Sequence, residues 1–315
     1  MIEFIRSDTH IDFLGKRHIA MGISGFLVLA SILLLIFKGL NFGIDFTGGT
    51  LVETRFATPP AIADVREALS TKNYGGAVIQ QYGEPNEILI RVQNHDGEDS
   101  STISNAVLAA LDGKFGNDKV EMRRVEYVGP QVGKELTQAG IMAVLFAMVA
   151  ILLYVTLRFE FRFALGADLA LAHDVFIVLG AFAVTGMEFD LTVVAGVLTV
   201  IGYSLNDTIV IFDRIREMMA LNRKKKNPEN EATTSNLAIN QTLSRSIITS
   251  FTVFLVVLAL FFLGGEVIHG FAFSLLVGVI AGTYSSIYIA SPIMLMMKGT
   301  TKSAEETSKE LEARP

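Results

Sequence analysis

Six long blocks of apolar residues constrain the fold of this chain more than any other feature. A helix of about 20 predominantly apolar residues crosses the hydrocarbon core of a bilayer. Only 18% of the 315 residues are charged, whereas about 25% are charged in soluble domains. The sequence therefore predicts a multi-pass α-helical membrane protein. The predicted spans are 19–37, 139–157, 163–185, 191–212, 247–263 and 271–297, with the last five forming one bundle over 139–297.

The positions of Lys and Arg predict the orientation of these spans, because short cytoplasmic loops of membrane proteins are enriched in both residues. The short loops 186–190 and 264–270 contain neither residue, whereas the segment between the fourth and fifth spans is rich in both. We therefore expect the N-terminal segment 1–18 and the tail 298–315 to be cytoplasmic. The long loop 38–138 then lies on the outer side.

The outer loop has the pattern of a small α/β domain. Runs rich in β-branched and aromatic residues predict strands, and helical spacing of apolar residues predicts two helices. The resulting order β-α-β-β-α-β is that of a ferredoxin-like domain. The predicted elements are a strand after the glycines of 43–56, a helix at 59–72, strands at 77–82 and 87–92 joined by a turn at 83–86, a helix at 100–115 and a strand at 120–128.

Several polar and ionisable residues fall inside the predicted spans, where each charge costs about 2.5–3.5 kcal/mol on insertion scales. His173 and Asp174 lie about ten residues, or ~15 Å, from the cytoplasmic start of the third span. Asn206 and Asp207 lie in the fourth span, and Asp207 is about 17 residues, or ~25 Å, from its outer end. Arg245 lies about 18 residues, or ~27 Å, before the outer end of the fifth span.

Asp207 and Arg245 therefore share nearly the same depth on consecutive spans. An arginine that approaches or leaves a buried carboxylate changes the pKa of that carboxylate, which makes such a pair a candidate proton switch. Two simpler interpretations stay open. Arg245 could extend to the cytoplasmic interface, and His173 with Asp174 could be a polar pair that fixes helix packing.

A ladder of small residues runs along the sixth span at intervals of four. Small residues let another helix approach closely, either within this chain or from a partner chain. The ladder consists of Ser274, Gly278, Gly282, Ser286 and Ala290.

The sequence gives no sign of a cofactor, a metal site or an enzyme active site. The chain has no cysteine, and its five histidines lack the spacing of metal ligands. Residues 45–50 resemble a phosphate loop only superficially, because G-x-x-x-x-G-K-[ST] occurs nowhere in the chain. A net charge of −6 is too modest to indicate nucleic-acid binding. Coupling to a proton gradient remains the favoured source of energy.

Four segments resemble signatures of the SecD/SecF protein-export family, which belongs to the RND transporter superfamily. They are FGIDFTGGT at 42–50, YVGPQVG at 127–133, LAHD at 171–174 and IGYSLNDTIVIFDRIRE at 201–217. The form of the last segment is similar to the SecF branch of the family, because the SecD branch carries aspartate where Asn206 stands.

The resemblance implies a six-helix RND-type transmembrane half with a periplasmic domain, in the bacterial inner membrane. It implies pairing with SecD, contact with the Sec translocon channel and its accessory membrane subunits, and action on an unfolded preprotein driven by protons. By position, Asp207 and Arg245 match the proton pathway of the family, as do Asn206, His173 and Asp174. SecD would supply the main acidic residue.

Two other function classes compete with this hypothesis. One is an RND-type transporter of small molecules or lipids, although such pumps usually carry two six-span halves in one chain. The other is a structural scaffold of the translocon, which would have little reason to hold charges inside the membrane. The sequence identifies no residue that contacts a substrate.

Overall fold

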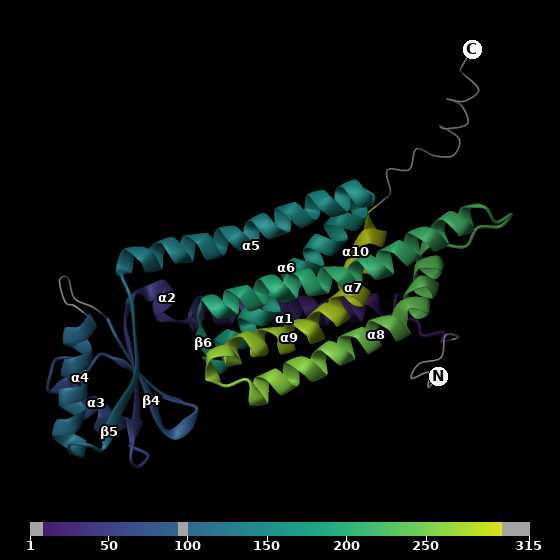
Figure 1. Ribbon diagram of the computed structural model, residues 1–315. Helices are drawn as coiled ribbons and strands as arrows, with labels where there is room; N and C mark the ends of the chain where they lie inside the picture. Colours follow the sequence, from purple (N-terminus) through teal and green to yellow (C-terminus); the bar gives the residue numbers. More distant parts are fainter. Residues whose placement is uncertain (1–8, 94–99, 298–315) are drawn as a thin grey trace.

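The computed structural model describes residues 9–93 and 100–297, and shows a bundle of long helices with a small α/β domain at one end (Figure 1). Within this described part, six helical segments are long and apolar enough to cross a membrane, which confirms the predicted fold class. They are α1 Arg17–Phe37, α5 Pro130–Arg158, α6 Phe161–Thr185, α7 Leu191–Arg223, α8 Glu231–Leu263, and a sixth built from η1 Glu266–Ile268, α9 His269–Ser285, the π-helix η2 Ser286–Ala290 and α10 Ser291–Met296. The predicted tail 298–315 and segment 1–8 lie outside the described residues.

Three of these helices extend well beyond the apolar blocks of the sequence. Helix α7 continues to Arg223 and α8 begins at Glu231, so both project from the bundle at the end far from the α/β domain (Figure 1). A helix satisfies its own backbone hydrogen bonds in water as well as in lipid, and hydropathy therefore marks the membrane rather than the helix end. Helix α5 similarly begins at Pro130, a residue type favoured in the first helical turn.

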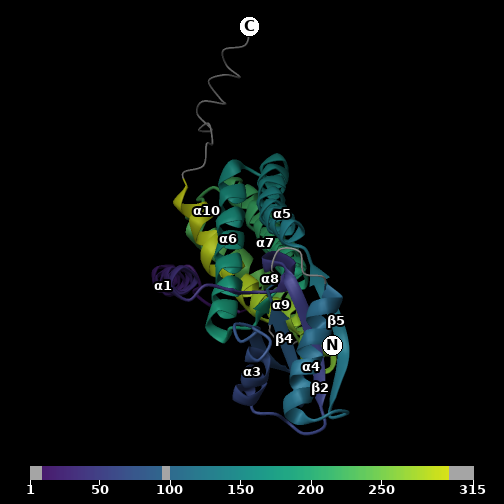
Figure 2. The ribbon, with the colours of Figure 1, turned by 90° about the vertical axis from the view of Figure 1, so that its left-hand side faces the viewer.

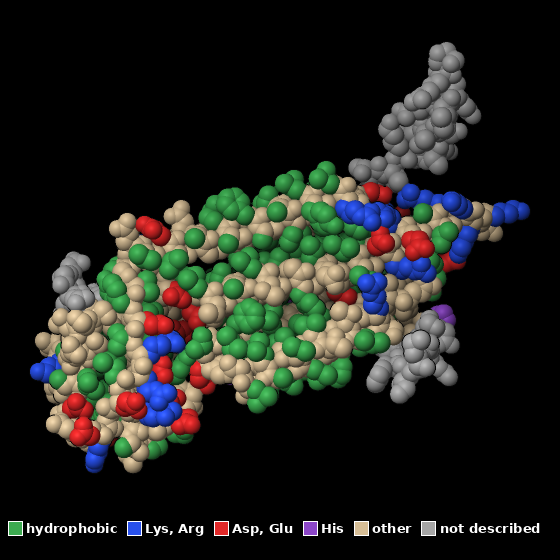
Figure 3. Space-filling model, viewed as in Figure 1, with side chains coloured by type: hydrophobic (Ala, Val, Ile, Leu, Met, Phe, Trp, Pro, Cys, Tyr) green, Lys and Arg blue, Asp and Glu red, His purple; other side chains and the backbone are tan. Residues whose placement is uncertain are grey.

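Positive and apolar side chains are segregated on the surface of the bundle. Lys and Arg side chains gather at the end opposite the α/β domain, and hydrophobic side chains cover its flank (Figure 3). An apolar flank is the surface that a lipid environment requires.

The α/β domain contains a four-stranded sheet with strand order β3-β4-β2-β5 and antiparallel neighbours throughout. Two helices lie between strands in the chain, giving the predicted ferredoxin-like order. The elements are β2 Gly49–Phe56, α3 Ile62–Ser70, β3 Val78–Tyr82, β4 Glu84–Val92, α4 Ser100–Phe115 and β5 Val120–Val128.

Alternation along the strands gives the sheet two different faces. Val52 and Ile90 point to the helix-covered face, where they are fully buried in one cluster with Leu69 of α3 and Leu111 of α4. The opposite face has no described helix of the domain on it and is turned toward the ends of the membrane helices that lie nearest the domain. This face therefore forms one wall of a cleft between the sheet and the bundle.

The segment 43–56 forms a strand after its glycines, as the sequence predicts, in β2. Its first part is a short helix, α2 Ile44–Thr47, which is followed by Gly48 at φ +68° and Gly49 at φ +129°. A Cβ at Gly48 would lie 2.9 Å from the backbone of Pro130, and one at Gly49 would lie 2.6 Å from the Val92 carbonyl oxygen. The two glycines thus permit a close junction of the sheet with α5, at a backbone conformation that other residues avoid.

A second junction involves a two-residue parallel pairing of β1 Asn41–Phe42 with β6 Glu188–Phe189. The turn predicted at 83–86 is shorter than expected, because only Gly83, at φ +71°, separates β3 from β4. The β1–β6 pairing joins the segment before the α/β domain to the loop between α6 and α7.

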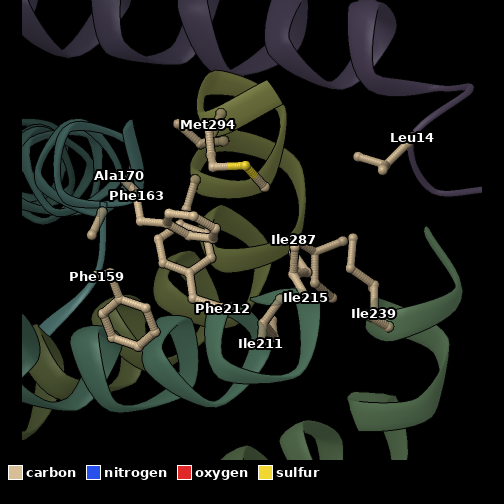
Figure 4. Close-up of a cluster of buried hydrophobic side chains, with 14 of the residues drawn as sticks. Leu14, Phe159, Phe163, Ala170, Ile211, Phe212, Ile215, Ile239, Ile287 and Met294 are labelled. Carbon is tan, nitrogen blue, oxygen red and sulfur yellow. The ribbon is translucent and has the colours of Figure 1, made fainter. Parts of the chain in front are cut away.

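Aromatic and aliphatic side chains fill the half of the bundle far from the α/β domain (Figure 4). Phe163 of α6 and Phe212 of α7 meet edge-to-face at 5.1 Å between ring centroids. Ile287 of the π-helix and Ile239 of α8 belong to the same buried cluster. Helix α1 instead lies at the edge of the bundle, beside α6 (Figure 2).

The ladder of small residues packs inside this chain, against α7. A Cβ added at Gly278 would overlap the Val200 side chain, and one added at Gly282 would lie 2.9 Å from the Ser204 Cβ. Ser274 is likewise fully buried and lies close to Gly196 of α7. Of the two alternatives for the ladder, the structure therefore supports close packing within the chain.

Candidate functional site

The five candidate residues lie on three neighbouring helices but in two environments. Helix α6 carries His173 and Asp174, α7 carries Asn206 and Asp207, and α8 carries Arg245. His173, Asp174 and Asp207 are buried in the bundle, whereas Asn206 and Arg245 are exposed on the surface of this chain. The site therefore combines a polar interior with a polar patch on the outside of the bundle.

Asp174 is fully buried and is the centre of the interior cluster. Its Oδ1 lies 2.9 Å from His173 Nδ1, and its Oδ2 accepts hydrogen bonds from Ser204 Oγ at 2.6 Å and Ser285 Oγ at 2.8 Å. These bonds join α6, α7 and α9. A buried carboxylate satisfied by several donors is stabilised in place.

A second polar contact lies about one helical turn along α7 from Ser204. Thr208 Oγ1 is 2.8 Å from Ser286 Oγ, and both side chains are buried. Ser286 is also the first residue of the π-helix η2. A π-helical turn within a longer helix is rare and frequently marks a functional site. The irregular turn of the sixth span thus lies beside the polar cluster.

His173 connects the cluster toward α1. An ionised Asp174 can only accept at Oδ1, so His173 donates through Nδ1 and keeps a lone pair on Nε2. His173 Nε2 has no hydrogen-bond partner among the described residues. The His173 ring lies 6.4 Å from the Tyr284 ring, and the Tyr284 hydroxyl donates to the Ala20 carbonyl of α1 at 2.8 Å.

Asp207 is the incompletely satisfied carboxylate of the site. The residue is 7% exposed, and within the described part of the chain its Oδ2 has no hydrogen-bond partner. Ser246 of α8 lies beside it, and Arg245 attracts its negative charge. An unpaired buried acceptor costs about 1–3 kcal/mol, which makes Asp207 the residue of this set whose placement most needs a functional reason.

Asp207 and Arg245 do not form a direct ion pair in the described chain, because no nitrogen–oxygen distance between them falls within 4.0 Å. Arg245 instead extends from the exposed face of α8. The guanidinium is thus near enough to influence Asp207 electrostatically without a direct ion pair.

A stripe of small and polar residues continues along both exposed helix faces. Thr199 and Gly202 precede Asn206 on α7, and Thr249 follows Arg245 on α8, all of them exposed. Polar groups facing lipid are costly, and those of transmembrane helices usually face protein or water. This patch therefore has the character of a surface that another membrane chain covers.

Sequence reasoning missed Ser285, Thr208 and Ser246 as parts of the site. Serine and threonine are common in membrane helices, where they also bond to their own backbone, so their type alone carries no functional signal. Ser286 was noticed only as a small residue of the ladder. The contacts among these side chains depend on the rotation of α9 against α7, which the sequence does not encode locally.

Family comparisons agree with this arrangement. A family model described as protein export membrane protein SecD/SecF, C-terminal, matches residues 108–300, and one described as the SecD/SecF GG motif matches residues 33–60. The chain belongs to the SecD/SecF family. The second match contains the Gly48–Gly49 junction between α2 and β2, so the motif of the SecD/SecF family coincides with the attachment of the external domain.

Individual relatives are similar over almost their full length. Protein translocase subunit SecF of Magnetococcus marinus is 54% identical, over 95% of this chain and 97% of the relative. The subunit of the same name from Escherichia coli O157:H7 is 41% identical, over 91% of this chain and 87% of the relative.

Solved SecDF structures share the fold. The crystal structure of SecDF from Thermus thermophilus, a translocon-associated membrane protein, is 37% identical with a TM-score of 0.83, and the match covers 92% of this chain. SecDF in its super-membrane-facing form is also 37% identical, with a TM-score of 0.68 over 97% of this chain. The chain spans only 39% and 41% of those SecDF chains.

Proposed function

We propose that this chain is a subunit of the Sec protein-export machinery that works with a SecD chain and uses the proton gradient to complete preprotein translocation across the bacterial inner membrane. In this proposal the termini are cytoplasmic and the α/β domain is periplasmic. The names of the relatives and the basic end of the bundle, opposite the α/β domain, support the proposal.

The observation that carries the proton-coupled role is the buried Asp207, one carboxylate oxygen of which has no hydrogen-bond partner among the described residues, beside the charge of Arg245. A carboxylate in a low-dielectric interior responds strongly to the approach or withdrawal of a cation. Proton uptake and release at Asp207 can therefore follow movement of Arg245, and the converse holds by linkage. Arginine itself keeps its proton throughout.

We assign different tasks to the other candidate residues. Asn206, adjacent to Asp207 but on the exposed face, would hydrogen-bond groups supplied by the partner chain. His173 and Asp174 form a network that links three helices, and the free Nε2 of His173 gives that network one atom able to accept a proton. No residue is assigned a catalytic role, and the donor set suggests no cofactor.

SecD is the partner that the exposed patch around Asn206 and Arg245 best suits. The matched SecDF chains are more than twice as long as this chain, which leaves room in them for a second half. A partner that covers the patch would place its own side chains next to Arg245 and thereby complete the proton pathway. The Sec channel, its accessory subunits and an unfolded preprotein are the further partners of this proposal.

The two competing functions receive less support. A self-contained small-molecule or lipid pump would need a second bundle to cover the polar patch on α7 and α8. A scaffold would gain nothing from an incompletely satisfied Asp207 inside the bundle. Neither competitor explains why Arg245 is both exposed and close to a buried acid.

The test replaces Asp207→Asn or Arg245→Met and follows preprotein export by inverted or right-side-out vesicles with an imposed proton gradient. We expect each variant to lose about 90% or more of the gradient-dependent part of export, since loss of a required proton-transfer group typically costs 10²–10⁴-fold. Asp213→Asn is the matched control, because Asp213 is an exposed carboxylate on the same helix. Normal gradient-dependent export by assembled Asp207→Asn and Arg245→Met complexes would refute the proton-coupled role.

A further inference from the structure

A cleft of about 700 Å³ separates the uncovered face of the sheet from the outer ends of the membrane helices. Leu51 of β2 and Leu89 of β4 lie at the base of the sheet side and are each only 4% exposed, whereas Ile62 of α3, which also lines the cleft, is 39% exposed. Met187 and Val267 come from the loops on the opposite side, and Val267 is 55% exposed. The cleft therefore offers apolar contact on both walls.

Two contacts between the domain and the bundle fix the width of the cleft. Arg91 Nη2 of β4 pairs with Glu188 Oε2 at 2.6 Å, with Arg91 buried beneath the sheet. At the other end, the turn at Gly83 lies close to Glu266 of η1, since a Cβ on Gly83 would be 3.3 Å from the Glu266 Cγ. The space between these contacts is thus an elongated slot along the strands.

The lining of the slot carries an excess of negative charge. Arg124 is the one Lys or Arg among the lining residues, and it already pairs with Glu126 at 3.1 Å. The negative charges outnumber the positive ones even when Arg91 is included. The carboxylates that line the slot are Asp45, Glu126, Glu188, Asp190 and Glu266.

Two side chains in the slot respond to this potential. Burial, together with the negative charges of Glu53, Glu266 and Glu188, raises the pKa of Tyr82 to about 12, although Arg124 opposes the shift. Burial is also the main reason that the pKa of Glu188 is raised, with Asp190 and Asp45 adding to the effect and Arg91 opposing it. Both pKa shifts arise mainly from burial, and the surrounding carboxylates add to them.

The carboxylates are spread along the slot rather than gathered at one point. Asp45 accepts a hydrogen bond from the Leu191 amide at 3.0 Å, and Asp190 accepts one from the Val193 amide at 2.9 Å. In the part of the chain that the structure describes, no three His, Asp or Glu side chains are placed to hold a metal ion. Distributed negative charge above apolar walls suits an elongated cationic ligand better than a single ion.

We propose that this slot binds an extended, unfolded polypeptide segment in which Lys or Arg side chains are interspersed with apolar ones. The apolar side chains of the segment lie on Ile62 and Val267, and the cationic ones reach the carboxylates at the rim. The inference rests on the proposed export function, because an unfolded chain crossing the membrane is the natural source of such a segment. It names the side-chain chemistry that the external domain recognises.

The experiment measures binding of short fluorescent peptides to the complex of this chain with its SecD partner in nanodiscs. A peptide of alternating Lys and Val should bind, and the affinity should fall as salt is raised, because salt screens the charges. A matched peptide of alternating Glu and Val should bind at least about tenfold more weakly, as expected for several lost ion pairs of modest individual strength. Equal affinity for the two peptides would overturn the proposal.

Two sets of variants locate the binding. The double change Glu126→Gln and Glu266→Gln should weaken binding of the Lys-Val peptide by about threefold to tenfold, given the modest value of solvent-accessible ion pairs. The control Glu217→Gln removes an exposed carboxylate at the opposite end of the bundle and should leave affinity unchanged. Unchanged affinity in the double variant would place the peptide elsewhere and refute the slot.

Photocrosslinking gives a readout that does not depend on affinity. A photoreactive side chain at Gln80, which lines the slot, should crosslink the Lys-Val peptide, whereas one at Lys72, exposed near the helix-covered face, should not. Crosslinking at Lys72 alone would overturn the proposal. If peptides fail to bind while export still depends on the proton gradient, the slot is refuted and the proposed function stands.

Discussion

At the residue scale, the main result is the contrast between two buried carboxylates on adjacent helices, α6 and α7. Asp174 accepts hydrogen bonds from two serines and lies against His173, while Asp207 keeps an oxygen without a partner. The first arrangement is that of a structural anchor and the second that of a responsive group. Both residues were identified from the sequence, because a charge inside an apolar span stands out. Their different roles depend on serines that carry no such signal.

Ser285→Ala tests the anchor. The substitution removes one donor to a fully buried carboxylate, and we expect a loss of about 1–3 kcal/mol in the free energy of unfolding. Thermal unfolding of the detergent-solubilised protein measures the effect. Thr199→Ala is the control, since the Thr199 side chain is exposed and bonds only to its own helix at Ala195. Equal stability of the two variants would show that the Ser285 hydrogen bond contributes little.

At the element scale, the sequence predicted the number and type of elements well but not their exact lengths. Helices α7 and α8 exceed their apolar blocks because a helix continues wherever its backbone bonds are satisfied. The α2 helix was missed because its four residues, Ile44–Thr47, are apolar and β-branched enough to suggest a strand. The π-helix η2 was also missed, since its local sequence resembles that of any apolar helix.

Packing of α9 against α7 yields a second prediction, about two glycines. Gly278→Ala places a methyl group against Val200, where the helices already touch, and should destabilise the protein by about 1–3 kcal/mol. Gly202→Ala, on the exposed face of α7 with no atom within 4 Å of the new methyl group, should be neutral or stabilise by up to about 1 kcal/mol. Thermal unfolding measures the stability of the two variants. Equal changes in stability would contradict the close packing of α9 against α7.

At the scale of the whole molecule, several contacts attach the α/β domain to the bundle. They include the glycine junction at Gly48 and Gly49, the β1–β6 pairing and the ion pair of Arg91 with Glu188. Their partners come from segments far apart in the sequence. No local pattern could have predicted them, although the matched GG motif marks one of them.

The docking of the domain should depend on pH through Glu188. Burial raises the pKa of Glu188 above its ordinary value of 4.5, so the docked state binds more protons than the undocked state. Protonation of Glu188 stabilises the docked state fully below pH 4.5, and this stabilisation is lost as pH rises through the raised pKa of Glu188. We therefore expect docking to strengthen as neutral solution is acidified.

Spin labels on introduced cysteines measure this response directly. The native chain has no cysteine that would have to be removed first. Labels at Lys72→Cys in the domain and Leu263→Cys at the outer end of α8 should report a narrower distance distribution at acid pH. Glu188→Gln removes the titrating carboxyl group and should give a distance distribution that does not change with pH. A pH response that persists in Glu188→Gln would assign the titration to another group.

The exposed guanidinium of Arg245 has a consequence for how the cell must produce this chain. An orphan copy would present a charge to the lipid tails, at a cost of about 2.5–3.5 kcal/mol on insertion scales. Synthesis in excess of its companion would therefore yield poorly tolerated molecules, which are natural targets for membrane quality-control proteases. We therefore expect the cell to make this chain and its partner subunit in equal amounts, because the partner would cover the exposed Arg245 side chain on α8.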